Sequence, residues 1–549
     1  MHQEKTWAGE RVCRAQSASR GGAIKYTAPS FVYYPLFRTL DHPANSQRSA
    51  ETSIAIVINE SAKRELIDLY FAHVQPTYPM FCKQSFEQDL AEKKIPDALF
   101  NAMLALASRF IPVTDVPALL GSLYPAPWDD FARLAERQMQ DQEDKNTPIL
   151  LNDIKAFALL TLYEYTKFPG RRAWMMVGNL VRMALSIGLH CLDSGQQSLS
   201  LSDFELEEHR FVWWTVWNLD SAINTLTGAP CGIESDNTST ALVSTSVADF
   251  TAGKSTQSTQ QFLPVDSERI WKSAQQLLNN DTEDGTNMYY LAICHLRHVM
   301  AFRRRLYTNP TPQSARHLTV LRNSLSYMRL SLPSWYFEPA RQLLLETPDK
   351  HRLRLESLLI LLISQIHVLE PITNTQLADI MRDDDLGNWV GCISIGEDIA
   401  AIFKAWRPGY FTGADPITST IIWYTTCILT IHTMSNFGQF DEIPDQRLVS
   451  ALDLLSLALD RFAQHWQISR ILADALKSLQ GWAWVRLGLS DIVSLLSQLR
   501  VPIDPMKQDP GTFNMWQIVE QAASVMAEID GLSSPRAQRL DTSPAKPGV

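Results

Sequence analysis

Hydrophobic residues along most of the chain recur every three to four positions, which is the period of a helix with one buried face. The first such stripe begins after Glu60 and consists of Leu66, Ile67, Tyr70, Phe71 and Val74. Pro76 and Pro79 follow it, and proline ends a helix because it has no amide hydrogen to donate. We therefore predict an amphipathic helix followed by a turn.

The same period predicts further helices, separated by clusters of Pro, Gly or Ser. They cover residues 96–109, 127–142, 152–168, 171–190, 202–226, 287–308, 317–331, 352–369, 386–406, 416–434, 446–465 and 468–487. Ser202 and Glu205 have the S-x-x-E spacing of a capping box, which marks a helix start. We find no alternating β period of useful length, so the predicted fold class is all-α. It is an irregular multi-helix fold whose second half could resemble a solenoid.

Composition divides the chain into five parts. Residues 1–58 keep no helical period for long and are expected to form a flexible N-terminal arm. Residues 59–233 form a helical core, and residues 262–530 form a second helical part. The segment between them, 234–261, is polar and rich in Ser and Thr, so we expect a linker there. Residues 531–549 have the composition of a disordered tail.

Charge and cysteine usage exclude several classes of protein. The 549 residues include 49 Lys and Arg and 59 Asp and Glu, a net charge of −10, which argues against a DNA-binding surface over most of the chain. The seven cysteines lie far apart, so they form neither a disulfide framework nor a metal-binding ladder. The first residues lack the apolar region of a secretory signal, and no stretch approaches the roughly 20 apolar residues of a membrane span. We expect neither secretion nor membrane insertion.

Three segments carry motifs in a fixed order. The matched positions are Tyr70, Phe71, Pro76 and Pro79 in the first; Arg171, Arg172, Trp174, Gly178, Arg182, Gly188 and His190 in the second; and Glu208, Arg210, Trp213, Trp214, Asp220, Gly228 and Pro230 in the third. Together they resemble the middle homology domain of fungal zinc-cluster transcription factors, the regulatory domain of the xylanolytic activator type, over about residues 60–240.

The resemblance implies a nuclear regulator of transcription that acts through an all-α regulatory domain. Its targets would be genes of metabolism or of secondary-metabolite biosynthesis. The partners implied are the transcription machinery or a DNA-binding partner, with a homodimer and a small-molecule effector as further options.

This sequence departs from the family's pattern at the zinc cluster. That cluster needs six cysteines within roughly 30 residues, and the first 81 residues hold only Cys13. No recognisable Zn2Cys6 cluster is therefore present in this sequence. We expect no cofactor, zinc only if a cluster lies outside the sequence given, and at most weak direct binding to DNA.

Most matched residues have a structural interpretation. One helical face collects Trp174, Val177, Val181, Ala184 and Leu185, and Gly178 and Gly188 would allow a second helix to approach closely. Arg171 and Arg172 stand at a helix start, where positive charge is unfavourable, so Glu207 or Glu208 could pair with them.

The third segment has two interpretations. Trp213, Trp214 and Trp217 favour core packing, with the wall of a small-molecule pocket as the alternative. Asp220 is expected to bond an arginine or a backbone amide rather than to do chemistry.

Candidate chemistry outside these motifs is weak. The aspartates 383–385 resemble the magnesium-binding helices of all-α terpene synthases, but Gly387 and Asn388 occupy the positions that a D-D-x-x-D motif needs. Cys294, His295 and His298 lack a second ligand pair at zinc-finger spacing. The basic run 303–305 lies in a predicted helix and is expected to face solvent. We predict a transcription regulator and no enzyme, with a helical scaffold or interaction protein, or less plausibly a terpenoid-type enzyme, as alternatives.

Overall fold

The structure is a computed structural model, and it describes residues 58–112, 114–115, 127–144, 148–194, 201–254, 260–279, 285–308, 311, 313–370, 385–435 and 446–482, together with seven residues between 485 and 499. All of these residues belong to one compact unit. The predicted tail and all but the last residue of the predicted N-terminal arm lie outside them.

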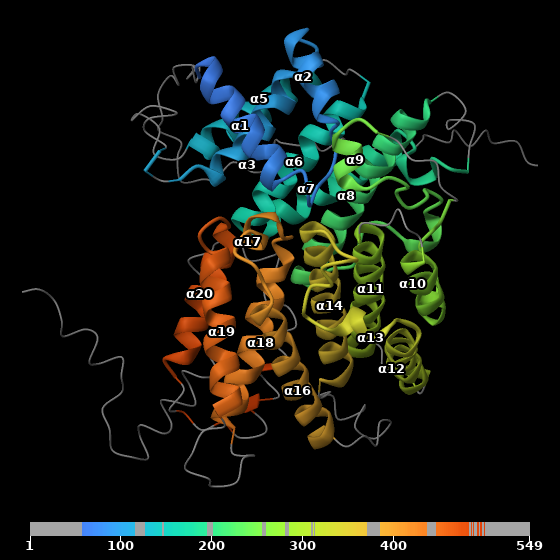
Figure 1. Cartoon of the computed structure of the whole chain (residues 1–549), viewed down its shortest axis with the longest axis vertical. Helices are drawn as coiled ribbons and strands as arrows, with labels where there is room; N and C mark the ends of the chain where they lie inside the picture. Colours follow the sequence, from blue (N-terminus) through green and yellow to red (C-terminus); the bar gives the residue numbers. More distant parts are fainter. Residues whose placement is uncertain are drawn as a thin grey trace, which may run out of the picture. The chain divides into compact units, whose positions relative to one another are not determined.

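The first group of helices lies together in the upper part of Figure 1. It comprises α1 (Glu60–His73), α2 (Lys83–Ala91), α3 (Asp97–Ala107), α5 (Pro127–Asp144), α6 (Leu151–Lys167), α7 (Arg171–Ser186), α8 (Asp203–Thr227) and the short α9 (Val247–Thr251). Helix α3 is almost entirely apolar and packs against α1, α5 and α6, while α7 packs between α6 and α8. The predicted capping box is confirmed, because Glu205 N lies 3.3 Å from Ser202 Oγ and the Glu205 carboxylate accepts from Ser202 N at 2.9 Å.

Long helices of the second group run side by side in Figure 1. The group comprises α10 (Ile270–Leu278), α11 (Thr286–Thr308), α12 (Gln313–Ser331), α13 (Ser334–Phe337), α14 (Pro348–Leu369), α16 (Asp385–Lys404), α17 (Tyr410–Gly413), α18 (Ile417–Met434), α19 (Gln446–Phe462) and α20 (Gln467–Gln480). Helix α14 packs against α11 and α16, and α18 packs against α19 and α20. Among the described residues the only β pairing is one isolated bridge between Ser435 and Leu487. The all-α, irregular multi-helix fold is confirmed.

The two groups of helices are joined by contacts between α8 and α11, α6 and α20, and α1 and α17. The hydroxyl of Thr77, just after α1, donates to the carbonyl of Gly413 at 2.5 Å. No helix in the described ranges has the length and apolar character needed to cross a bilayer.

The segment 234–261 differs from the expected linker over its described residues, 234–254 and 260–261. The amides of Ser244 and Thr245 donate to the buried carboxylate of Glu207, at 2.5 and 2.8 Å. Phe250 is fully buried and stacks on Phe211 with ring centroids 4.4 Å apart. The prediction of a loose linker is therefore wrong for these residues, because a buried side chain of α8 supplies the binding free energy that the composition of the segment lacks.

Candidate functional site

Asp220, near the end of α8, is the centre of a buried cluster of hydrogen bonds. Its carboxylate accepts from the backbone amides of Gly232 and Ile233 at 2.8 and 3.1 Å, and from Asn224 Nδ2 at 2.7 Å. Trp174 of α7 donates its indole NH to the Asn224 side-chain oxygen at 3.1 Å. The carboxylate therefore holds the chain after α8 against α7 and α8, and the expected bonding of Asp220 to backbone amides is confirmed.

Arg297 of α11 completes this cluster from a distant part of the chain. One of its guanidinium nitrogens lies 3.2 Å from the Asp220 carboxylate and 2.7 Å from Ser221 Oγ. The guanidinium also lies over the ring of Trp217, 4.7 Å from its centroid. Sequence reasoning did not identify this residue, although a charge within the apolar stripe of a helix is a signal that it has a buried partner.

Arg210, in the first half of α8, is the centre of a second buried cluster. It pairs with Asp193 through two nitrogens and with Glu207 at 3.1 Å, and all three side chains are buried. The same Asp193 carboxylate accepts from the amide of Ala241 at 2.7 Å. Arg210 thereby fixes the α7–α8 connection and the segment after α8 to one point.

The tryptophans of the third segment belong to the core. Trp213 and Trp214 have no exposed surface, and Trp217 has 2%. Trp214 and Trp217 border a void with room for about one water molecule, too small for an organic ligand. Core packing, the first of the two interpretations, is the one that the structure supports.

The two arginines that begin α7 have different surroundings. Arg171 is exposed, whereas Arg172 pairs with Glu136 of α5 and lies 3.3 Å from Glu164 of α6. The suggested partners Glu207 and Glu208 are wrong. Glu208 instead binds Lys155 of α6 at 2.7 Å.

The glycines of the second and third segments act in two ways. Gly188 and Gly228 have φ of 79° and 64°, a left-handed conformation that suits glycine, and they end the α7 and α8 regions. A side chain at Gly178 would meet only the exposed Arg182, at 3.6 Å, so this glycine does not mark a close helix approach. Close approach was expected for both Gly178 and Gly188, and it is wrong for Gly178. Among the last matched positions, His190 is half-buried and Pro230 is exposed.

The first motif segment connects the two groups of helices. Tyr70 and Phe71 are buried and meet edge to face, Pro79 is buried and Pro76 is half-buried. Arg352 of α14 lies within 3.5 Å of the Pro76 carbonyl. The motif therefore forms part of the joint between helices that are distant in sequence.

Asp415, which precedes α18, is a fully buried meeting point of this joint. Its Oδ2 accepts from Asn218 of α8 and from the hydroxyl of Tyr289 of α11, each at 2.9 Å. Glu356 of α14 is also buried, and Arg352 donates to it at 2.9 Å. Burial and the charge of Asp415, opposed by Arg352, raise the pKa of Glu356 to about 7.

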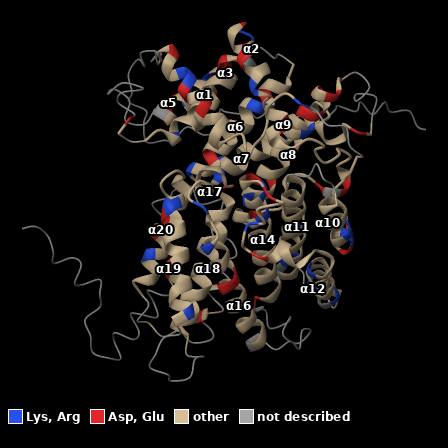
Figure 2. Ribbon diagram, viewed as in Figure 1, with Lys and Arg blue, Asp and Glu red and all other residues tan. Residues whose placement is uncertain are grey.

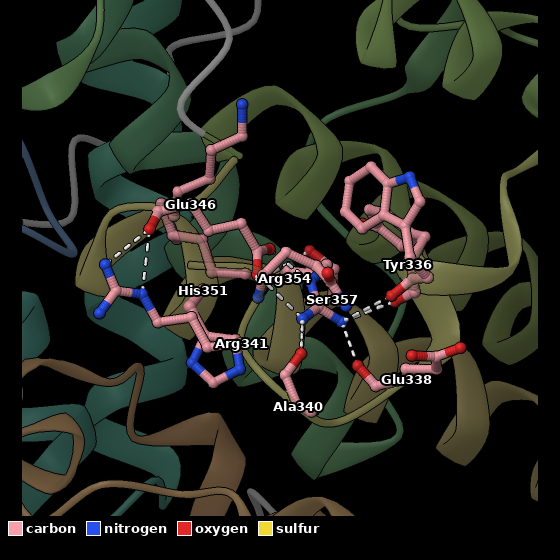
Figure 3. A network of polar contacts seen from close by, with 12 residues as sticks. Tyr336, Glu338, Ala340, Arg341, Glu346, His351, Arg354 and Ser357 are labelled. Atoms are coloured by element: carbon pink, nitrogen blue, oxygen red, sulfur yellow. Dashed lines mark hydrogen bonds and ion pairs between the residues drawn. The ribbon is translucent and has the colours of Figure 1, made fainter. Parts of the chain in front are cut away.

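A second dense network surrounds Arg354 of α14 (Figure 3). Its guanidinium binds both carboxylate oxygens of Glu346, at 2.5 and 3.1 Å. It also donates to the carbonyls of Tyr336, Glu338 and Ala340, at 2.6 to 2.9 Å. Because these carbonyls and the Glu346 carboxylate all bind one guanidinium, Arg354 holds the turn between α13 and α14 in place. That turn presents three leucines to solvent: Leu343, Leu344 and Leu345, exposed by 74%, 99% and 59%.

A largely apolar cavity lies where α8, α11, α14 and α18 meet. It has a volume of about 440 Å³ with its open mouth included, and its enclosed part has room for only a few water molecules. Thr225 of α8 and Thr420 of α18 are partly exposed lining residues, while His367 and Tyr424 form a buried polar end. It is larger than the void beside the tryptophans.

The described residues do not fit a zinc cluster. Six of the seven cysteines are described, and no group of three or more Cys, His, Asp or Glu in this part of the chain could hold a metal ion. Burial raises the pKa of the Cys294 thiol to about 12 and, with His298, lowers that of His295 to about 3. Cys13, Asp383 and Asp384 lie outside the described residues.

The basic run 303–305 is largely internal, contrary to the expected solvated face. Arg303 is buried and pairs with Glu370 at 2.9 Å, and Arg304 is half-buried and donates to the Ala229 carbonyl at 2.8 Å. Only Arg305 is exposed. Figure 2 shows Lys and Arg distributed over many of the described helices rather than gathered on one.

These features lie in and around a region with known relatives. Residues 67–294 match the family model of the fungal specific transcription factor domain. The chain therefore carries a fungal transcription factor domain. This domain contains all three motif segments, the Arg210 cluster and Asp220 itself, whereas Arg297 lies just beyond its end.

Curated relatives of the domain are regulators from fungi. The chain is 27% identical over 190 residues to the citrinin biosynthesis transcriptional activator mrl3 of Monascus ruber, which is 33% of this chain and 35% of that protein. It is 27% identical to the transcription factor tazR of Aspergillus terreus, over 34% of this chain and 30% of the relative. It is 28% identical to the ascochitine biosynthesis cluster transcriptional regulator of Didymella fabae, over 28% and 27%. The chain spans about a third of the length of these relatives.

Proposed function

We propose that this protein is a nuclear regulator of transcription that controls genes of metabolism or secondary-metabolite biosynthesis. The observation that carries the proposal is the fungal transcription factor domain over residues 67–294. Relatives named for citrinin and ascochitine biosynthesis support this class of target genes. The partners would be the transcription machinery or a DNA-binding protein, with a second copy of the chain as a further option.

The chain would reach promoters through a DNA-binding partner, or through a zinc cluster that lies outside the sequence given. Its net charge of −10 opposes contact with phosphates, and two of the three arginines in its basic run 303–305 are engaged internally. We expect no sequence-selective gel shift at physiological salt and no stoichiometric zinc in the purified chain. Two zinc ions per chain, or a selective shift without a partner, would contradict this.

The regulatory role is tested in the source fungus by tagging the protein, imaging it and sequencing the chromatin bound to it. We expect nuclear signal, enrichment at promoters of a biosynthetic gene cluster, and altered transcripts of that cluster when the gene is deleted. Cytosolic signal with unchanged transcripts would favour the helical scaffold instead.

Catalysis is not part of the proposal. Incubation with prenyl diphosphates and magnesium should leave the substrates unchanged. Product that disappears in Asp383→Asn or Asp384→Asn would replace the regulatory role with a terpenoid-type activity.

A further inference from the structure

We propose that the outer face of α7 binds an acidic α-helix of another protein. This face, the α7 stripe, consists of Arg171, Met175, Gly178, Arg182 and Leu185, which recur every three to four residues and therefore lie on one side of the helix. That the partner acts in transcription rests on the proposed function, but the surface itself does not.

The α7 stripe faces solvent, although α7 packs between α6 and α8. Met175 and Leu185 are exposed by 41% and 38%, and both arginines of the stripe are exposed as well. The buried residues of α7 lie on its other sides. Arginine and methionine are enriched where proteins contact one another, so a stripe that combines them with leucine has the composition of a docking surface.

The two arginines of the stripe have no acidic partner among the described residues. Arg171 makes no hydrogen bond or ion pair there, and Arg182 donates only to oxygens of the preceding turn of its own helix, at 3.3 and 3.4 Å. The inward-facing Arg172, by contrast, pairs with Glu136 of α5. None of the 16 residues of α7 is an Asp or a Glu. Two unpaired positive charges on one stripe are complementary to a partner that carries carboxylates.

Gly178, at the centre of the stripe, has no packing role in the described part of the chain. A side chain there would meet only the exposed Arg182, at 3.6 Å. Glycine inside a helix is less favourable than alanine, so this residue lowers the stability of α7 without a packing gain. Its absent side chain instead leaves a low point on the stripe, where a second helix can approach the backbone closely.

The spacing of the stripe defines the partner. Arg171 and Arg182 are eleven residues apart, which is about 16 Å along a helix. A helix that lies along the stripe would place two carboxylates at this spacing, a small residue opposite Gly178, and apolar residues against Met175 and Leu185.

Two other occupants fit this stripe less well. The α7 helix of a second copy would bring four arginines together without a carboxylate on either helix, and like charges across an interface are unfavourable. The phosphates of DNA would pair with the arginines but would leave Met175 and Leu185 without apolar contact.

The test uses the purified full chain and a fluorescently labelled, alanine-based peptide of roughly 18 residues, which is long enough to form a helix. One version carries two glutamates eleven positions apart, with leucines and a central alanine on the same side. The matched version has glutamines in place of the glutamates. Fluorescence anisotropy at low salt should detect the glutamate peptide and show about 5-fold weaker binding of the glutamine peptide, because exposed ion pairs contribute modestly. Added salt should reduce this difference.

Variants of the stripe separate docking from folding. Arg171→Gln and Arg182→Gln should each remove most of the preference for the glutamate peptide. Gly178→Leu fills the low point and should weaken both peptides at least about 10-fold. The fold has space for this side chain, so thermal unfolding should show the variant intact. Arg64→Gln, which changes an exposed arginine of α1, is the matched control and should alter neither affinity.

Three outcomes would overturn the proposal: no binding of the glutamate peptide to the wild type, equal affinities of the two peptides, or equal losses in Arg64→Gln and the arginine variants of the stripe. A DNA duplex that binds more tightly than the glutamate peptide, and loses this binding in Arg171→Gln and Arg182→Gln, would assign the stripe to nucleic acid and overturn it as well. None of these measurements involves a promoter, so failure here is distinct from failure of the nuclear role.

Discussion

Arg297 of α11 lies 3.2 Å from the carboxylate of Asp220 of α8, and both side chains are almost fully buried. Removing one partner of a buried pair leaves an uncompensated charge, which costs about 3 to 5 kcal/mol. We therefore expect Arg297→Met and Asp220→Asn each to lower the free energy of unfolding by about 3 kcal/mol or more in urea titrations, and the double variant to lose less than their sum.

The matched control for this pair is Lys254, whose partner Asp249 lies 3.2 Å away at the surface. Lys254→Met should cost less than about 1 kcal/mol, because exposed ion pairs contribute little. Equal losses in Lys254→Met and Arg297→Met would show that the buried pair has no special role.

Glu356 should make stability depend on pH. The pKa of Glu356 is raised from its ordinary value of 4.5 to about 7 in the folded protein. Between these two pH values the folded protein therefore keeps a proton on Glu356 that the unfolded chain has released. This contribution is fully present below about pH 4.5 and is lost as the pH rises towards 7. Chemical denaturation between pH 5 and 8 should therefore show Glu356→Gln gaining stability relative to the wild type as the pH rises. A difference that stays constant with pH would contradict the assignment.

The segment after α8 should resist proteolysis. Thermolysin, which prefers apolar residues, should not cut at Leu242 or Val243 in the wild type, because both are buried. Glu207→Ala removes the carboxylate that binds the amides of Ser244 and Thr245, and should make this segment the first site of cleavage.

Glu208→Ala is the control for this experiment, because its partner Lys155 belongs to α6 rather than to the segment. Early cleavage in the wild type or in both variants would mean that the carboxylate of Glu207 does not hold the segment.

The motif glycines should respond in opposite directions to alanine. Gly188→Ala and Gly228→Ala force a side chain into left-handed backbone and should each cost about 1 kcal/mol or more. Gly178→Ala lies inside α7 with space for the added methyl group and should gain about 0.5 to 1 kcal/mol. Thermal unfolding of the three variants checks this, and a loss in Gly178→Ala would point to a packing role that the structure does not show.

The sequence predicted the helices well because their signals are local. The apolar period and the Ser202 capping box placed the start of α8, and the run of tryptophans in α8 was correctly interpreted as core. Helix α2 was missed because it is short and buries only Phe86.

Two of the errors share one physical cause, a partner that is distant in sequence. Arg303 belongs to a basic run typical of a surface, yet Glu370, 67 residues later, neutralises it in the interior. The segment 234–261 is polar, yet Glu207 and Asp193 supply its bonds. Composition describes a residue's own preference, and here the fold supplied the compensating group from a distant part of the chain.

The Asp415 cluster bears on how much of the chain must be kept together for it to fold. The domain match ends at residue 294, inside α11, whereas Asn218 and Tyr289 within the match find their acceptor in Asp415, beyond it. A fragment cut at the end of the match would lose more than half of α11 and leave these buried donors without their carboxylate. The stretch that sequence similarity delimits is therefore shorter than the unit that folds together. Residues 67–294 depend on the helices that follow them for partners of their buried polar groups.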